Sequence, residues 1–336
     1  MTASAHRRWH GKEYLDEVPG TPPLVDVEWL DKNKKDVVIL HATYDPECKM
    51  NQRDFVKAYY QDLDKRIERF KSDEYKNSHI PKAIEFSINC ATYPGRTEKF
   101  YLYTPLEVSR YLQRLAIFPD EHIVVYSSGP FNGMLYASKV RWLLKLYEFT
   151  KVSVLDGGLG AWKKAGKPVT DEVYVLQPSV HVPGRLNLDE HVNFSDLTSA
   201  TDDRYVPILH QLQQYNFIDC RPAAQFQGRA KPSQFIDWQV SGTFIQHSKN
   251  LPSLNLVTTK GFMASKQEIR RAAREAKYDK NFPTVLFCYD GMQCHLVGLA
   301  MEHAGYPPPK IYAGGLVEIE MRQPNFINGQ YGCPLY

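Results

Sequence analysis

A cysteine at the end of a buried strand is the residue of this chain with the clearest chemical potential. Cys288 follows the apolar run 283–287 and precedes a short loop containing glycine, after which an apolar helical pattern begins. Backbone N–H groups that converge at such a helix start, and the positive end of the helix dipole, both favour a thiolate. A thiolate held in this way is a nucleophile suited to covalent catalysis.

The composition excludes several other classes of protein. The chain has 336 residues, which is long enough for two domains of about 150 residues each. Hydrophobic residues make up 43% and charged residues 24%, as in soluble globular proteins. The net charge of +3 is small and the basic residues are dispersed, so neither nucleic acid nor membrane is predicted as a partner. No apolar run approaches the roughly 20 residues that span a bilayer.

The cysteines indicate a reducing compartment. They contain no C-x-x-C pair, which argues against a zinc site or a disulfide framework, and neither a metal nor a cofactor is predicted. No signal-peptide pattern is present, and acidic residues follow the basic start of the chain at once. We therefore expect a cytoplasmic protein, with the mitochondrion as the alternative. The six cysteines are Cys48, Cys90, Cys220, Cys288, Cys294 and Cys333.

The segment around Cys288 is a copy of an earlier segment. Each has a buried strand, a glycine loop, a helical stretch, a second short strand and a Gly-Gly-Leu turn. Strands that alternate with helices predict parallel-sheet α/β domains, and the long period favours two copies of one domain. The segments are 123–129, 134–147 and 152–159 in the first copy, and 284–291, 296–304 and 310–316 in the second.

The repeat predicts the domain organisation. We expect one domain over 20–170, an inter-domain linker rich in Pro, Asp, Asn and Ser over 171–204, and a second domain over 205–336. Ligands bind beyond the carboxyl ends of strands in open α/β sheets. That rule puts Ser127 and Cys288 at matching positions, and only the second copy carries a nucleophile there. One catalytic and one supporting half are predicted.

The ordered set of fragments resembles the two-domain rhodanese family, which comprises thiosulfate and 3-mercaptopyruvate sulfurtransferases. The likeness runs from about residue 24 to the C-terminus, and it implies tandem rhodanese-like domains, each a mostly parallel sheet flanked by helices and related by internal duplication. The fragments are the His79-Ile80-Pro81-Lys82-Ala83 turn, residues 152–158, Phe217-Ile218-Asp219-Cys220-Arg221, the Cys288 loop and residues 311–315.

The resemblance implies an activity for Cys288. In the family, a thiolate takes the outer sulfur of thiosulfate or 3-mercaptopyruvate as a persulfide and passes it to cyanide or a thiol. Cys288 would be the persulfide carrier, and thioredoxin-like reductants are candidate partners. The cradle for substrate and anion would be Tyr289, Asp290, Gly291, Met292 and Gln293.

The loop departs from the family pattern, which reads C-R-K-G-V-T or C-G-S-G-V-T. Asp290 stands where the thiosulfate type has a lysine, so we expect it to repel thiosulfate and to raise the pKa of the thiol, or instead to cap the helix. Gln293 replaces a threonine and can still donate a hydrogen bond. Arg229 and Lys231 are candidate substrate-binding residues, because arginines that usually grip the carboxylate are absent nearby.

These departures leave alternatives open. Cys288 could be a buried structural cysteine, and the chain could be a catalytically weak or inactive rhodanese-like module that binds or regulates. Cys294 reads as a core residue or as a resolving thiol, and His295 as a core residue or as a proton-transfer group. Asp219 and Arg221 are predicted to form an ion pair that supports the loop.

Overall fold

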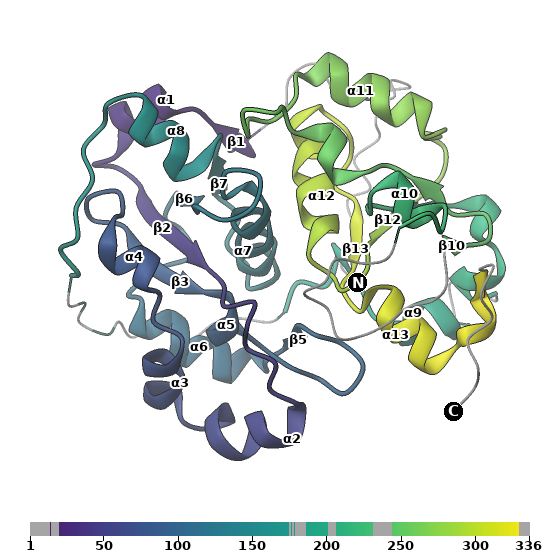
Figure 1. Ribbon diagram of the computed structural model, residues 1–336, viewed down its shortest axis with the longest axis horizontal. Coiled ribbons are helices and arrows are strands. Elements are labelled where there is room, and N and C mark those ends of the chain that lie inside the picture. The colour runs from purple at the N-terminus through teal and green to yellow at the C-terminus, as the bar shows by residue number, and fades with distance from the viewer. Residues whose placement is uncertain are drawn as a thin grey trace, which may run out of the picture.

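The computed structural model describes residues 14, 20–174, 176, 178, 186–200, 206–230 and 244–328. Two lobes lie side by side, and each is built around a five-stranded sheet (Figure 1). The N-terminal domain contains the elements from β1 to α8, and the C-terminal domain contains those from β8 to β14.

All strands of the N-terminal sheet are parallel, in the order β1-β7-β6-β2-β3. A short antiparallel hairpin, β4–β5, stands apart from this sheet. The strands are β1 Leu24–Val25, β2 Val38–Thr43, β3 Ile84–Ser87, β4 Thr92–Tyr93, β5 Tyr101–Leu102, β6 Ile123–Tyr126 and β7 Val152–Leu155. The helices are α1 Val27–Asn33, α2 Gln52–Phe55, the π-helix η1 Val56–Tyr60, α3 Leu63–Arg69, α4 Asp73–Asn77, α5 Ile88–Ala91, α6 Pro105–Arg114, α7 Met134–Leu146 and α8 Gly158–Lys164.

The C-terminal sheet is also parallel, in the order β11-β9-β12-β13-β8. A second antiparallel pair, β10–β14, lies outside it. The strands are β8 His191–Val192, β9 Asn216–Asp219, β10 Phe244–Ile245, β11 Lys249–Asn250, β12 Thr284–Phe287, β13 Lys310–Tyr312 and β14 Ile327–Asn328. The helices are α9 Phe194–Thr198, α10 Ala223–Phe226, α11 Lys266–Glu275, α12 Gln293–His303 and α13 Gly315–Arg322, with 3-10 turns η2 Ile208–His210, η3 Leu212–Gln214, η4 Ser253–Leu256 and η5 Pro324–Phe326.

The two sheets have the same topology, which confirms the predicted duplication of a parallel α/β unit. Strands β1, β7, β6, β2 and β3 correspond in order to β8, β13, β12, β9 and β11. The correspondence extends to single hydrogen bonds. The N–H of Leu159 donates to the carbonyl of Ser127 at 3.0 Å, and the N–H of Leu316 donates to the carbonyl of Cys288 at 3.0 Å. Ser127 and Cys288 therefore occupy matching positions just beyond β6 and β12.

Part of the predicted linker belongs to the second sheet. Residues 191–198 form the edge strand β8 and the helix α9, although their composition is typical of a linker. Two of the polar residues in this segment cap the start of α9. The Asn193 side chain accepts from the N–H of Asp196, and the Asp196 carboxylate accepts from the N–H of Asn193, so the two close a capping box.

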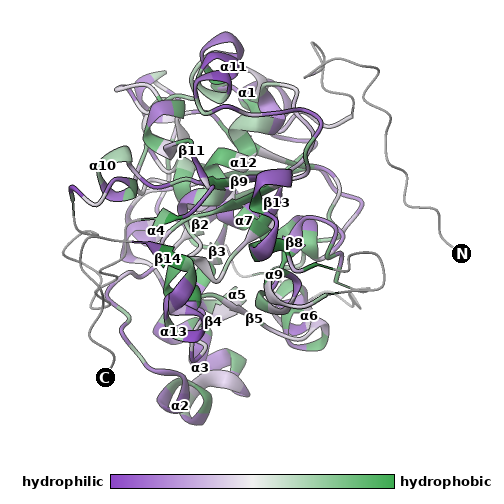
Figure 2. Cartoon of the chain, turned by 90° about the vertical axis from the view of Figure 1, so that its right-hand side faces the viewer, coloured by the Kyte–Doolittle hydropathy of each residue, from purple (hydrophilic) through white to green (hydrophobic). Residues whose placement is uncertain are grey.

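Helices α7 and α12 face each other where the two domains meet (Figure 1). Most of α7 is buried, and so is α12 from Cys294 to Met301. Figure 2 shows hydrophobic residues along the interior strands and α12, whereas the outer helix α11 is mostly hydrophilic. Arg141 of α7 and Glu302 of α12 form a bidentate ion pair across this contact, at 2.8 and 2.9 Å. The C-terminal domain therefore packs against a helix of the N-terminal domain.

Every helix in the described parts of the chain is too short or too polar to cross a membrane.

Candidate active site

Cys288 is held between the end of β12 and the start of α12. Its side chain is 0% exposed. Helix α12 begins at Gln293 without a side-chain cap, since the N-cap residue Met292 makes no capping hydrogen bond. The orphan N–H groups of a first helical turn need an acceptor. Here the N–H groups of Gln293 and Cys294 bond to the Cys288 sulfur.

The net effect of these groups favours the thiolate of Cys288. Burial opposes the thiolate, and so does the nearby charge of Asp290, but hydrogen bonds from the Cys294 thiol and from the N–H groups of Cys294 and Gln293 outweigh both. The pKa of Cys288 therefore lies below its ordinary value. The Sγ atoms of Cys288 and Cys294 are 3.9 Å apart. Burial and the adjacent Cys288 sulfur raise the pKa of Cys294 well above its ordinary value, so Cys294 remains a neutral donor.

Gly291 allows the loop to turn this tightly. Its φ is +81°, in the left-handed region that glycine tolerates best. A Cβ atom at Gly291 would lie 1.9 Å from the carbonyl oxygen of Ala313, at the end of β13. The loop is therefore packed backbone to backbone against the 313–315 turn, and no side chain fits between them.

Asp290 does not cap the helix but pairs with a lysine of the other domain. The Nζ atom of Lys99 lies 2.9 Å from Oδ2 of Asp290. Burial alone would lower the pKa of Lys99, but Asp290 raises it above its ordinary value. The expectation that Asp290 opposes thiolate formation is correct in sign. The hydrogen bonds to the sulfur outweigh this effect of Asp290.

A second lysine of the N-terminal domain reaches the loop from behind. Lys139 of α7 is 0% exposed, and its Nζ atom donates to the carbonyl oxygen of Gly291 at 3.2 Å. Burial lowers the pKa of Lys139 to about 8, while the Cys294, Glu98 and Cys288 side chains act in the opposite direction. Two cations of the N-terminal domain thus contact the Cys288 loop of the C-terminal domain.

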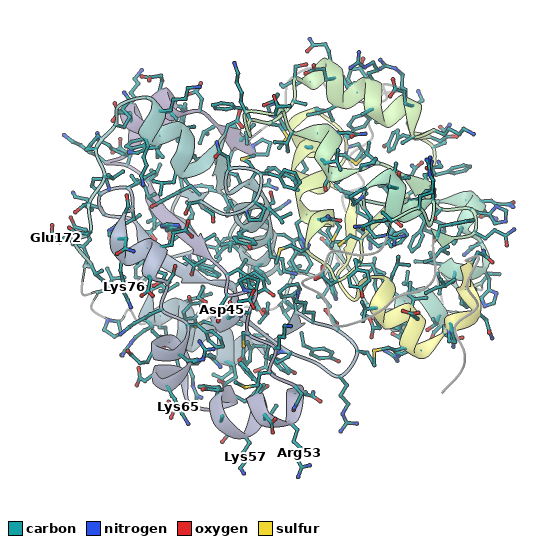
Figure 3. The ribbon with its side chains drawn as sticks, in the orientation of Figure 1. Asp45, Arg53, Lys57, Lys65, Lys76 and Glu172 are labelled. Atoms are coloured by element: carbon teal, nitrogen blue, oxygen red, sulfur yellow. The ribbon has the colours of Figure 1, made fainter. Side chains whose placement is uncertain are left out.

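A cavity of about 920 Å³ lies between the domains and ends at the loop. Tyr289 and Asp290 line it on one side, and residues from 44 to 57 and from 89 to 100 line the other. The charges favour anions, because five lining residues are basic and two are acidic: Lys49, Arg53, Lys57, Arg96 and Lys99 against Glu98 and Asp290. Figure 3 shows Arg53 and Lys57 projecting outward at the edge of the N-terminal domain.

The predicted substrate-binding residues do not join this site. Arg229 is exposed and bonds to the side chain of Gln227, which directly precedes Gly228 in the same turn. It does not line the cavity. Lys231 lies outside the described residues.

The remaining predicted residues have clear positions. Gln293 enters the first turn of α12, and its buried Oε1 atom has no hydrogen-bond partner among the described residues. His295 is buried beside Trp142, with ring centroids 4.5 Å apart. Burial and Lys139 lower its pKa well below the ordinary value, so it is a neutral core residue.

The predicted ion pair under the loop is confirmed. Arg221 donates from Nη2 to Oδ2 of Asp219 at 2.7 Å, and both side chains are buried.

Lys99 and Lys139 are the functional residues that local sequence reasoning misses. They are 191 and 152 residues away from the loop residues that they contact. Lys139 does leave a signal. It lies on the same helical face as Leu135, Trp142 and Leu146, and a lysine on an apolar face indicates a buried charge with a purpose.

The comparisons with known proteins agree with the fold. The family model of the rhodanese-like domain matches residues 61–165 and 207–322, one match in each domain. The chain therefore belongs to the rhodanese-like family.

Its relatives carry sulfurtransferase names. The chain is 30% identical over 301 residues to mpst-1 of Caenorhabditis elegans, a candidate thiosulfate sulfurtransferase, covering 88% of this chain and 91% of the relative. It is 30% identical to the thiosulfate sulfurtransferase of Mus musculus, covering 75% and 80% of the two chains. The solved structure of the 3-mercaptopyruvate sulfurtransferase SseA from Escherichia coli matches with a TM-score of 0.67 and 23% identity, over 88% of this chain and 99% of SseA.

Proposed function

We propose that the protein is a sulfurtransferase that moves a sulfane sulfur from thiosulfate or 3-mercaptopyruvate to a thiol or cyanide through a persulfide on Cys288. The observation that carries this proposal is a fully buried thiol whose pKa is nevertheless lowered. A structural cysteine in an apolar core shows the opposite shift, as Cys90 and Cys220 do because of burial. The sulfurtransferase names of the relatives support the same reaction.

The chemistry consists of two displacements at sulfur. The Cys288 thiolate attacks the outer sulfur of thiosulfate, the S–S bond breaks, and sulfite leaves with the electron pair. The persulfide anion then gives its outer sulfur to cyanide, which leaves as thiocyanate and regenerates the thiolate. The N–H groups of Gln293 and Cys294 are placed to stabilise the anionic sulfur in both steps.

The basic cavity supports an anionic donor. Lys99 is the lining cation next to the loop, where it also holds Asp290. Because the Cys288 side chain is fully buried and does not line the cavity, a donor reaches it only when Tyr289, Asp290 or a neighbouring wall moves. We propose that donor anions draw Lys99 away from Asp290 and so begin this movement.

Mass spectrometry of intact protein tests the proposal directly. After incubation with thiosulfate or with 3-mercaptopyruvate, we expect an adduct of about 32 Da on Cys288 that cyanide removes. Cys288→Ser should give no adduct, and Cys90→Ser should behave like the wild type. If the wild-type thiol stayed unmodified with both donors, the proposed sulfurtransferase activity would be contradicted.

That outcome would favour the second candidate, a catalytically weak or inactive module that binds or regulates. Complete burial of the Cys288 side chain is the observation on its side. For the compartment, we propose the cytoplasm, with the mitochondrion as the alternative. The five described cysteines are free thiols, which suits a reducing environment, and imaging of a tagged full-length chain would separate the two compartments.

A further inference from the structure

Lys139 is a buried cation that points from one domain into the reactive loop of the other. It sits on α7, its side chain is 0% exposed, and its ammonium donates to the carbonyl of Gly291 at 3.2 Å. Its Nζ atom also lies 4.4 Å from the ring centroid of Phe100 and 5.0 Å from that of Trp142. No ion pair joins Lys139 to a carboxylate among the residues that the structure describes.

Burial of the Lys139 ammonium is unfavourable in free energy unless an anion compensates its charge. A buried ammonium loses its hydration, and one neutral hydrogen bond does not replace it. The neighbouring cations of the same helix are compensated in the usual way. Arg141 pairs with Glu302 at 2.8 Å, and Lys145 pairs with Glu190 and with Glu302. Among the described residues, Lys139 thus differs from Arg141 and Lys145 because it has no ion pair with a carboxylate.

The groups that face Lys139 identify the counter-charge. From the β12–α12 segment, Cys288, Cys294 and Asp290 act on it, and from the segment before β5, Glu98 does. Two histidines, His295 of α12 and His191 of β8, also feel its charge, and both are neutral because burial lowers their pKa values.

Most of these groups are unsuitable as an anion. Cys294 is neutral, because burial raises its pKa well above the ordinary value. Asp290 is already held by Lys99 at 2.9 Å. Burial and Glu318 raise the pKa of Glu98 to about 7, so it carries only part of a charge at neutral pH. Cys288 is the group that acts on the charge of Lys139 and whose own pKa is lowered.

We propose that Lys139 is the counter-ion of the Cys288 thiolate and a positioning residue for its loop. The supporting domain provides, across the domain interface, the positive charge that the loop itself lacks at Asp290. The extension to the persulfide anion rests on the proposed sulfur transfer, whereas the thiolate part does not. Helix α7 in the first copy thereby becomes part of the site in the second.

The test is the pH dependence of Cys288 alkylation in the full-length chain. Iodoacetamide modification is followed on the Cys288 peptide by mass spectrometry, in the wild type, Lys139→Met and Lys139→Gln. Because an adjacent opposite charge favours the charged form, we expect both variants to be alkylated about tenfold more slowly at pH 7 and to recover at high pH. Lys34→Met, a surface lysine paired with Asp31, is the control for net charge.

Two comparisons keep the inference falsifiable. Lys139→Gln removes the charge but retains a donor for the Gly291 carbonyl. If this variant were alkylated at the wild-type rate, the counter-ion role would be overturned, and only the hydrogen bond to Gly291 would remain as the function of Lys139. In Lys139→Met the Cys288 thiol can take up a proton, so no unpaired buried charge remains, and urea unfolding should show little loss of stability. A variant that unfolds more easily and has an unshifted alkylation profile would reduce Lys139 to a structural residue.

Persulfide loading separates the failure of this inference from the failure of the proposed function. If the wild type takes up no sulfur from either donor but Lys139→Met still shifts the alkylation profile, sulfur transfer fails and the counter-ion stands. If the wild type loads normally and Lys139→Met alters neither loading nor alkylation, the counter-ion fails and sulfur transfer stands. We expect loading in the wild type, and slower loading in Lys139→Met that recovers with rising pH.

Discussion

The sulfur atoms of Cys288 and Cys294 lie 3.9 Å apart, one at the end of a strand and the other in the first turn of the next helix. Their pKa values move in opposite directions. Burial and the Cys288 sulfur raise the pKa of Cys294, whereas hydrogen bonds, one of them from the Cys294 thiol, lower the pKa of Cys288 against the effect of its burial. Once Cys288 is ionised, the neutral Cys294 thiol is the donor in this contact. A thiol with a raised pKa is a poor attacking group, which argues against its role as a resolving thiol.

Cys294→Ala should therefore weaken the nucleophile. A hydrogen bond to a charged group contributes about 1.5 kcal/mol, so we expect about tenfold slower alkylation of Cys288 at neutral pH. The loss should disappear at high pH, where the thiol is ionised in any case. Cys294→Ser, which keeps a donor, should retain part of the rate. Cys90→Ala, another buried cysteine, is the control, and an equal alkylation rate in Cys294→Ala and the wild type would contradict the assignment.

The ion pair between Lys99 and Asp290 should govern access for anions. Lys99→Met leaves the Asp290 carboxylate unpaired beside the thiol, so it should slow thiocyanate formation from thiosulfate. Since the pair is partly exposed, we expect an effect of about two- to fivefold. Asp290→Asn in the Lys99→Met background should restore part of the rate, as a double-mutant cycle would measure. Strictly additive effects would show that the two residues act independently.

The sequence predicts the framework of this site but not its charges. Cys288, the strand before it and the helix after it follow from local patterns, and the duplication follows from a repeated order of such patterns. Asp290 shows why the charges cannot be predicted locally. Its sequence neighbours contain no cation, so the loop sequence alone predicts that thiosulfate is repelled. The compensating Lys99 comes from a distance of 191 residues, through a domain contact that no local pattern records.

A substitution at Gly291 tests whether activity requires the tight turn of the loop backbone. In Gly291→Ala, the new methyl group would meet the Ala313 carbonyl at 1.9 Å in a left-handed conformation, so the loop has to shift. We expect at least tenfold slower sulfur transfer and a loss of about 1–3 kcal/mol in unfolding free energy. Gly298→Ala is the matched control in α12, where a Cβ would meet nothing closer than 3.5 Å. It should keep full activity and gain up to about 1 kcal/mol.

The buried pair between Arg141 and Glu302 should make the domain contact sensitive to acid. Burial opposes ionisation of Glu302, but Arg141 and Lys145 lower its pKa to about 2, from an ordinary value of 4.5. A group with a lowered pKa stabilises the folded state above its ordinary value and loses that contribution as the pH falls towards the folded value. Glu302→Gln leaves Arg141 buried without its partner, so we expect a loss of about 3–5 kcal/mol at pH 7 in urea unfolding.

The difference in unfolding free energy between the wild type and Glu302→Gln should hold down to about pH 5 and shrink between pH 4.5 and 2, because only the wild type has this carboxylate to protonate. Glu28→Gln, a 77% exposed carboxylate paired with Lys167, is the matched control and should change stability by less than about 1 kcal/mol. A difference that stays constant through pH 3, or an equal effect of the two substitutions, would mean that the Arg141–Glu302 pair does not hold the domains together. The contact that brings Lys139 to the loop would then depend on apolar packing of α7 against α12 alone.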